Sequence, residues 1–260
     1  MRRIVTPFLI TPLLVVALVA LLAATAAAQT TTTATTAPSY AAALEARLAK
    51  EWKDPALAKE IVAGLSPETL ASLAAKVPQA QVATSPFLAY RPKPIAAKQV
   101  DSLIVFSFGN RVDATGTATA GPTNEQLAMA VKQFVAKHKV PVYAQHEVAQ
   151  FLTGVPNVTS IDETVGADGK VVYLSTAGVA QQAQEKAQAA GVHLGTVGVV
   201  CFADHVGRCL LTTEKAGLTP AGIPKGITLP STYDTQSGQP WTRDRKSYLQ
   251  TDLVGRLATL

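Results

Sequence analysis

The sequence predicts an α/β protein with a Rossmann-like, doubly wound parallel sheet and an N-terminal helical extension. From Asp101 onward, short apolar runs alternate with helical patterns. Runs such as Leu103–Phe108 and Val197–Ala203 are apolar at nearly every position, which is typical of strands buried on both faces. A closed eight-stranded barrel would need more strand–helix units, so we expect an open sheet.

Residues 1–28 have the three parts of a secretory signal peptide. Arg2 and Arg3 form a basic start, Phe8–Leu22 is largely apolar, and small residues extend to Ala28. Cleavage after Ala28 is the favoured interpretation. Retention as a membrane anchor is the alternative, because the segment is long enough to cross a bilayer. Both interpretations predict an extracytoplasmic protein, whether secreted, periplasmic or envelope-associated, and membrane contact is expected only through this segment if it is uncleaved.

Residues 29–39 are a linker rich in Thr and Ala, and residues 40–97 are predicted to be a helical extension and connector. Apolar residues recur at helical spacing from Ala42 to Trp52, and again from Leu57 to Leu65 after the Asp54-Pro55 break. A third helix is expected from Ser66, with Pro67 at its first position. These helices form either a cap on the main domain or a loosely attached spacer.

Residues 98–260 are predicted to form the α/β domain. Strands are expected at Leu103–Phe108, Val140–Ala144, Val171–Leu174, Val197–Ala203 and Gly226–Leu229. Helices are expected at Thr123–His138 (with Thr123 and Gln126 in capping-box spacing), Glu147–Leu152, Ala177–Ala190, Val206–Ala216 and Trp241–Leu257. Gly191 and Gly217 are expected to end two of these helices. The loop Asn110–Pro122 is either a flexible flap or a tolerant surface loop.

The charge of the chain is modest and dispersed. The chain has 23 basic and 18 acidic residues, and loss of Arg2 and Arg3 with a cleaved signal would leave a net charge of +3. Nucleic-acid binding needs a concentrated basic face, so no nucleic-acid partner is expected. Cys201 and Cys209 are interpreted as small buried hydrophobic residues rather than as a bridge, because one lies in a strand and the other in the following helix.

Open parallel sheets bind ligands beyond the carboxyl ends of their strands, so the residues that follow each predicted strand are the candidates for a site. Polar side chains follow each of the first four strands, and we expect them to converge on one rim of the sheet. They are, strand by strand, Ser107, Asn110 and Arg111; Gln145, His146 and Glu147; Ser175 and Thr176; and Asp204, His205 and Arg208.

His205, His146 and Glu147 are the catalytic candidates, as general acids or bases. His205 and Arg208 lie one turn apart near a helix start, which suits a phosphate or carboxylate. Each has a structural alternative: His205 as an ordinary polar contact, Arg208 as a surface arginine, and Glu147 as a first-turn charge facing the helix dipole.

The remaining candidates, Ser107, Asn110, Arg111, Gln145, Ser175, Thr176 and Asp204, are interpreted as ligand-binding residues. Thr176 and Asp204 are also placed where helix N-caps occur, and that role is favoured for both.

Several familiar site motifs are absent from the sequence. It contains no G-x-G-x-x-G after the first strand, no phosphate-binding P-loop and no G-x-S-x-G nucleophile elbow. It also contains no H-E-x-x-H and no paired Cys/His spacing, so no metal site is expected. The sequence identifies no cofactor.

The domain resembles the YdcF/SanA-like envelope proteins, a family without a settled reaction. Asp101–Gly109 looks like the opening strand of that family, and VGVVCFADHVGRCLLTTEKAG (Val197–Gly217) is similar to its late strand and His-x-x-Arg segment. His205 and Arg208 fall on that histidine and arginine. Ala144-Gln145-His146 departs from the family's Ser-Gly-Gly-like turn, and Ser175-Thr176 stands where an Asn-rich helix start is usual. The resemblance implies a Rossmann-like fold and an envelope location in a divergent exported member.

Two functions from different classes follow. The first is an envelope protein that binds a small anionic metabolite or a cell-wall precursor through Arg111, His205 and Arg208. The second is a transferase- or hydrolase-like enzyme with His205 or His146 as acid or base. The lack of a nucleophile elbow, metal motif or phosphate loop favours the first. A weaker third hypothesis gives the N-terminal helices a role in docking a partner.

Overall fold

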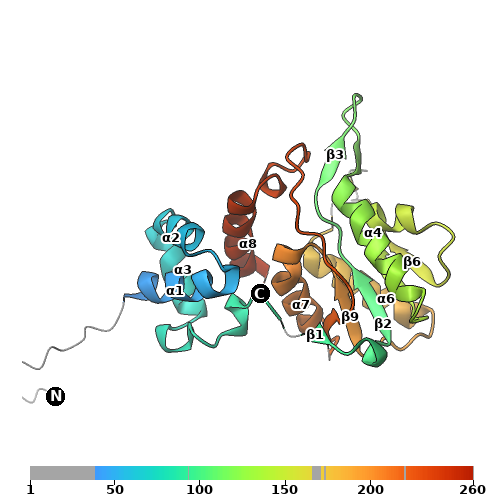
Figure 1. The fold of residues 1–260 in the computed structure, drawn as a ribbon, viewed down its shortest axis with the longest axis horizontal. Coiled ribbons are helices and arrows are strands. Elements are labelled where there is room, and N and C mark those ends of the chain that lie inside the picture. The colour runs from blue at the N-terminus through green and yellow to red at the C-terminus, as the bar shows by residue number, and fades with distance from the viewer. Residues whose placement is uncertain (1–38, 93, 166–170, 173, 220, 260) are drawn as a thin grey trace, which may run out of the picture. The chain divides into compact units, whose positions relative to one another are not determined.

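The computed structural model describes residues 39–92, 94–165, 171–172, 174–219 and 221–259 (Figure 1). The predicted signal or anchor at residues 1–28 and the linker up to residue 38 lie outside the described residues. Within the described ranges, no helix is long and apolar enough to cross a membrane.

A six-stranded parallel sheet forms the centre of the fold. Its order is β1-β10-β9-β2-β5-β6. The strands are β1 (Pro94–Ile95), β2 (Ser102–Val105), β5 (Val142–Gln145), β6 (Val158–Ile161), β9 (Val197–Val200) and β10 (Ala221–Pro224). The chain proceeds from β2 outward through β5 to β6, then crosses back to β9 on the other side of β2. The strand order therefore reverses between β2 and β9, and the predicted doubly wound Rossmann-like fold is confirmed.

Helices cover both faces of the sheet. Leu103 and Val105 of β2 pack in one apolar cluster with residues of α4 (Pro122–Val135) and α5 (His146–Ala149). Ile104, the residue between them, packs in a second cluster with α6 (Thr176–Ala189) and α7 (Val206–Lys215). Successive side chains of a strand point to opposite faces, so these continuously apolar strands bury both faces at once.

The N-terminal helices α1 (Tyr40–Trp52), α2 (Pro55–Ala63) and α3 (Pro67–Lys76) lie where the sequence predicts them. Asp54 and Ser66 cap α2 and α3 by accepting bonds from backbone N–H groups, and a proline follows each cap. The three helices share an apolar cluster with Leu249 and Leu253 of α8 (Arg245–Thr259). Figure 1 shows them gathered beside α8. They are therefore a packed cap on the α/β domain and not a loose spacer.

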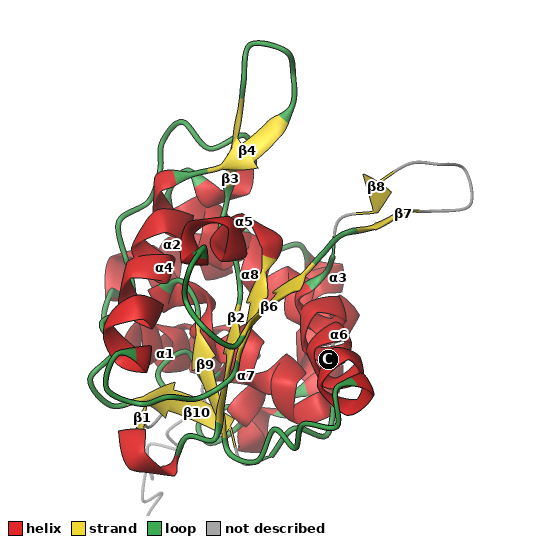
Figure 2. Ribbon diagram, turned by 90° about the vertical axis from the view of Figure 1, so that its right-hand side faces the viewer, coloured by secondary structure: helices red, strands yellow, loops and turns green. Residues whose placement is uncertain are grey.

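Two short hairpins project from the domain (Figure 2). Strands β3 (Asn110–Val112) and β4 (Ala118–Ala120) pair antiparallel within the segment predicted as a flap or surface loop. Strands β7 (Thr164–Val165) and β8 (Val171–Val172) form the other hairpin. Short 3-10 helices occur at Gln79–Gln81, Pro86–Leu88, Ala97–Gln99, Gln150–Leu152, Ala203–His205 and Pro240–Thr242.

Two predicted strands are wrong. Val171–Leu174 contributes only β8, which pairs with β7 outside the central sheet, and the strand that the sheet uses there is β6. Gly226–Leu229 is not a strand, because β10 lies earlier, at Ala221–Pro224, and ends before Gly226, whose φ is 91°. The apolar residues at both mispredicted places are short runs in which periodicity alone does not separate a strand from a packed loop.

The predicted helix starts also need correction. Gly121 caps α4 with Pro122 at its first position, so the Thr123–Gln126 capping box does not form. Ser175, not Thr176, is the N-cap of α6, since its hydroxyl accepts a bond from Gly178 N at 3.1 Å. Asp204 lies in a 3-10 turn and does not cap α7, whose N-cap residue is His205.

Candidate functional site

A pocket of about 240 Å³ lies where β2, β5 and β9 end, at the reversal of the strand order. We call it the strand-end pocket. Crevices at this position are the usual ligand sites of open α/β sheets. Six of the residues predicted from the sequence line it: Ser107, Gln145, Ser175, Thr176, His205 and Arg208.

Ser107 and Gln145 join neighbouring strands at the pocket. The Ser107 backbone N–H donates to Gln145 Oε1 at 3.1 Å, and both residues are buried. This bond continues the β2–β5 pairing beyond the regular ladder through a side chain. It fixes the direction of the Gln145 side chain toward β2.

The N-terminus of α6 forms another part of the wall. Ser175 and Thr176 both line the pocket, and the first turn of α6 contains no acidic residue. A helix N-terminus carries a partial positive charge and exposes backbone N–H groups that lack partners inside the helix. No carboxylate of this turn competes with a ligand for that charge.

The orientation of His205 is set by Tyr248 of α8. The Tyr248 hydroxyl lies 2.6 Å from His205 Nδ1 and donates to Asp252 Oδ1 at 3.2 Å. A hydroxyl has one proton to give. The direction of the 2.6 Å bond to His205 follows the tautomer of the ring: Nδ1 donates to the tyrosine oxygen when it carries the hydrogen and accepts from it when it does not.

Behind Arg208 lies a buried charge cluster. Arg208 Nε lies 2.8 Å from Asp252 Oδ1, and Arg256 Nε lies 2.7 Å from Asp252 Oδ2. Burial raises the pKa of Asp252, but Arg256 and Arg208 more than offset it and hold this pKa below its ordinary value. Burial, with Asp252 beside it, raises the pKa of Tyr248 well above its ordinary value, so the phenol stays protonated.

The charge cluster is positive overall. Among the described residues of the cluster, two guanidinium groups share the single carboxylate of Asp252. Arg256 is fully buried, donates to the carbonyl oxygens of Phe87 and Ala89, and lies 3.8 Å over the ring of Tyr90. Arg208 retains 19% exposure of its side chain and lines the pocket. The uncompensated charge is therefore presented to the strand-end pocket through Arg208.

Helix α8 and the 3-10 helix before it (Pro240–Thr242) bring to this site residues that the sequence motifs do not predict. Tyr248, Asp252 and Arg256 lie at i, i+4 and i+8, on one buried face of α8. Polar and charged side chains at the spacing of an apolar face were the available signal. Trp241, 44% exposed, lines the pocket from the loop before α8.

Three predicted site residues lie outside the strand-end pocket. Arg111 makes a two-point ion pair with Asp234, at 2.5 and 2.9 Å, which ties the β3–β4 hairpin to a distant loop. The carbonyl of Asn110 accepts from Gly238 N in the same region. Asp204 accepts from Tyr233 Oη and Arg245 Nε, both at 2.9 Å. These contacts hold the segment between β10 and α8 in place.

His146 and Glu147 also lie elsewhere. They begin α5 immediately after Gln145, and with Glu163 they line a separate cavity of about 300 Å³. The residues that were predicted to form one site at the rim of the sheet therefore line two separate cavities. Gln145 contributes to one, and the two residues that follow it contribute to the other.

The two cysteines are buried and unbridged. Burial raises the pKa of the Cys209 thiol well above its ordinary value, and the neighbouring Cys201 adds to this effect. A neutral, buried thiol is a poor nucleophile, so neither its protonation nor its exposure suits Cys209 to covalent catalysis.

Comparison of the chain with protein-family models, with curated proteins and with solved structures finds no match.

Proposed function

We propose that this chain is an exported protein of the cell envelope that binds a small anionic metabolite, or the anionic group of a cell-wall precursor, in the strand-end pocket. The observation that carries the proposal is the unequal charge of the cluster behind the pocket wall. Among the described residues, the fully buried guanidinium of Arg256 and the partly exposed one of Arg208 share one carboxylate, and Arg208 is the member that reaches the pocket. An anion supplies the missing negative charge.

The pocket offers an anion donors from two helices. Arg208 comes from α7, and the N-terminus of the neighbouring helix α6 contributes the hydroxyl of Thr176. Charge-assisted bonds of this kind are stronger than neutral ones, and a helix N-terminus favours phosphate and carboxylate alike.

The volume limits the size of the group that is bound. Sites for drug-sized ligands are commonly about 300–1,000 Å³. A pocket of about 240 Å³ suits a phosphate, a carboxylate or a small metabolite, with Trp241 at its rim available for apolar contact. A larger precursor would place only its anionic end in the pocket.

The oriented imidazole supports a second function, that of a transferase- or hydrolase-like enzyme. His205 lines the pocket, and Tyr248, which donates to Asp252, holds the ring through Nδ1, so the imidazole is oriented as a general acid or base requires. His146, the other histidine candidate, lies outside this pocket. In this function His205 would take a proton from a nucleophile that the ligand or water supplies.

The first test is a ligand screen by thermal shift on the purified chain. The panel contains inorganic phosphate, sugar phosphates, nucleotides, amino-acid derivatives and lipid-linked wall precursors. A ligand present at 100 times its Kd stabilises the folded state by about 2.7 kcal/mol. Arg208→Gln is expected to weaken binding roughly 10- to 100-fold, the loss of a charge-assisted bond. Its fold is expected to survive, because Arg256 remains as the partner of Asp252.

Arg111→Gln is the matched control. It also removes an arginine paired to an aspartate, but it lies outside the strand-end pocket, so binding should be unchanged. Equal loss of binding in both variants would contradict a site at Arg208, and so would the absence of any anionic ligand in the panel. His205→Gln separates the two functions: a binding protein loses affinity, whereas an enzyme keeps affinity and loses turnover.

The YdcF/SanA-like resemblance and the envelope location are parts of the same proposal. Both rest on residues: the His-x-x-Arg segment at His205 and Arg208, and the signal-like segment at residues 1–28. Fractionation of expressing cells, with N-terminal sequencing of the mature chain, tests the location and the cleavage after Ala28 together.

A further inference from the structure

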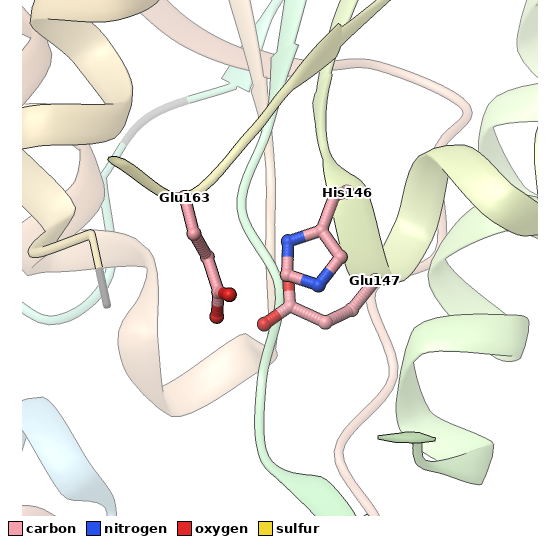
Figure 3. Close-up of side chains that lie close together, drawn as sticks. All are labelled: His146, Glu147 and Glu163. Atoms are coloured by element: carbon pink, nitrogen blue, oxygen red, sulfur yellow. The ribbon is translucent and has the colours of Figure 1, made fainter. Parts of the chain in front are cut away.

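His146, Glu147 and Glu163 converge beyond the ends of two neighbouring strands. β5 and β6 pair in parallel up to Gln145 and Ile161, and the three residues follow directly after these ends. One ligand atom from each lies within 4.8 Å of the others. In Figure 3 the carboxylates of Glu147 and Glu163 face each other, with the His146 ring beside them.

Glu147 is a buried carboxylate whose only ion-pair partner among the described residues is His146. The residue is only 4% exposed, and its Oε2 makes no hydrogen bond. His146 Nδ1 lies 3.4 Å from that oxygen and makes no hydrogen bond either. Burying an ionised carboxylate is costly unless it is paired or coordinates a metal. The described part of the fold therefore positions an acceptor here and gives its Oε2 no hydrogen-bond donor.

No basic side chain of the described ranges neutralises the two glutamates. Lys186 of α6 is committed to Asp162, 3.1 Å away, and to the carbonyl oxygen of Ser160. The ion pairs of the described residues give Glu147 no partner besides His146, and give Glu163 none. Two adjacent carboxylates that no basic side chain of the described residues neutralises favour the binding of a cation.

The distances suit a transition metal. Zinc binds histidine nitrogen and carboxylate oxygen at about 2.0–2.2 Å, so neighbouring ligand atoms of a tetrahedral site lie roughly 3.3–3.5 Å apart. The His146 Nδ1 to Glu147 Oε2 distance is already 3.4 Å. Glu163, which is only partly buried, has the freedom to close the wider gap by rotation of its side chain.

We propose that His146, Glu147 and Glu163 bind a divalent transition-metal ion, with zinc as the best match. An imidazole in the ligand set favours zinc over magnesium and calcium, which prefer all-oxygen sites. Three protein ligands leave a fourth tetrahedral position for water, the arrangement of catalytic rather than structural zinc sites. The site is independent of the strand-end pocket, and it replaces the expectation from sequence that the chain has no metal site.

The cavity leaves room at the open position. It is bounded on the far side by the β4 residues Ala118, Thr119 and Ala120 of the β3–β4 hairpin. His146 retains 37% exposure of its side chain, so solvent and ions reach the ligands. A water or a small donor molecule therefore fits beside the bound ion.

Isothermal titration of the purified, chelator-treated chain with zinc, and separately with magnesium, tests the proposal. Wild type is expected to bind one zinc per chain and to bind it more tightly than magnesium. Glu163→Gln and His146→Asn should each weaken zinc binding by more than about tenfold. Glu214→Gln, a change of the same type at an exposed position of α7, should leave binding unaltered.

The apo protein supplies a second measurement. Glu147→Gln removes a buried carboxylate whose Oε2 makes no hydrogen bond, so its Tm without metal should exceed that of wild type. Zinc should raise the Tm of wild type and not that of this variant. No zinc binding at millimolar concentration, unchanged binding in Glu163→Gln and His146→Asn, or a preference for magnesium would each overturn the proposal.

Discussion

At the scale of single residues, Asp252 connects the candidate pocket to the rest of the molecule. It is fully buried, it contacts both Arg208 and Arg256, and it accepts the proton of Tyr248. Among the described residues of the cluster, Arg208, Arg256 and Tyr248 contact no carboxylate other than that of Asp252. The residue therefore sets the charge of the pocket wall and, through Tyr248, helps to hold the orientation of the His205 ring.

Asp252→Asn should strongly destabilise the fold. The change leaves the fully buried guanidinium of Arg256 and the partly exposed one of Arg208 without the carboxylate that they share, and breaking a buried pair in this way typically costs about 3–5 kcal/mol. Urea denaturation followed by circular dichroism measures the loss. Asp234→Asn is the control, because its partner Arg111 is 37% exposed and such surface pairs contribute about 0–1 kcal/mol. Similar losses in the two variants would contradict the role given to Asp252.

The stability difference between wild type and Asp252→Asn should depend on pH in the acid range. The pKa of Asp252 is lower in the folded state than its ordinary value. The stability it contributes is therefore complete above the unfolded pKa, about 3.9, and is lost as the pH falls through the lower folded pKa. The difference in unfolding free energy between wild type and Asp252→Asn should shrink below about pH 4. A difference that stays constant down to pH 2 would show that Asp252 is not ionised in the native state.

At the scale of elements, α7 packs unusually close to the segment before the sheet. A Cβ on Gly207 would overlap the carbonyl oxygen of Ala89 and lie 2.6 Å from Arg256 Nη2. This is the carbonyl to which Arg256 donates. The glycine therefore permits the contact between α7, α8 and the cap.

Gly207→Ala should destabilise the protein although alanine is the better helix former. The propensity gain of about 1 kcal/mol is outweighed by overpacking, which typically costs 1–3 kcal/mol, and by loss of the Arg256 bonds. Thermal unfolding by circular dichroism measures the net effect. Gly178→Ala in the first turn of α6 is the control, since its nearest contact is a leucine methyl carbon at 3.2 Å, which can move. Stabilisation by Gly207→Ala would contradict the close packing.

Helices and strands were predictable from the sequence where a nearby capping residue, proline or glycine marks their ends. The cap helices begin at Asp54-Pro55 and Ser66-Pro67, and α6 and α7 stop before Gly191 and Gly217, which both have positive φ. The strand β6 was missed because Val158–Ile161, at the edge of the sheet, has two polar residues between two apolar ones and lacks the continuous apolar run of β2 or β9. Its position follows from pairing with β5, a non-local contact that leaves no local signal.

The site was predictable only in part, for the same reason. Strand order places Ser107, Gln145 and His205 at one crevice, and the rule for parallel sheets anticipates this. Tyr248 and Asp252 come from α8, far along the chain, and only its packing brings them behind the pocket. Gln145 and His146 face different cavities because the chain turns into α5 between them. The periodicity of apolar residues in the sequence does not predict this turn.

At the scale of the whole molecule, the cap and the α/β domain share one core. Trp52, Leu73 and Leu88 of the cap region belong to the same apolar cluster as Phe108, Phe202 and Leu253. Arg256 reinforces it by binding two carbonyl groups of the segment that joins the cap to β1. The predicted extension is therefore part of the folding unit.

Deletion of residues 40–80 should abolish stable folding of the remainder. The deletion exposes Phe202, Leu249 and Leu253, which are buried against the cap. Limited proteolysis and thermal unfolding measure the effect. Replacing the exposed hairpin tip at residues 113–117 with a short glycine turn is the control and should leave Tm nearly unchanged. A cooperative melt in the deleted chain would show that the cap is a separate module.

The two tryptophans of the chain give this architecture an optical consequence. Trp52 is 1% exposed and lies edge-on to Tyr90 in the cap, whereas Trp241 is 44% exposed at the rim of the strand-end pocket. Their indole emission therefore separates by wavelength and by access to a collisional quencher. Iodide quenches the emission of Trp241, and a ligand in the strand-end pocket should reduce this quenching. The emission of the shielded Trp52 lies at shorter wavelength and should change only when the cap unfolds. One unlabelled sample therefore reports binding and unfolding as distinct fluorescence signals.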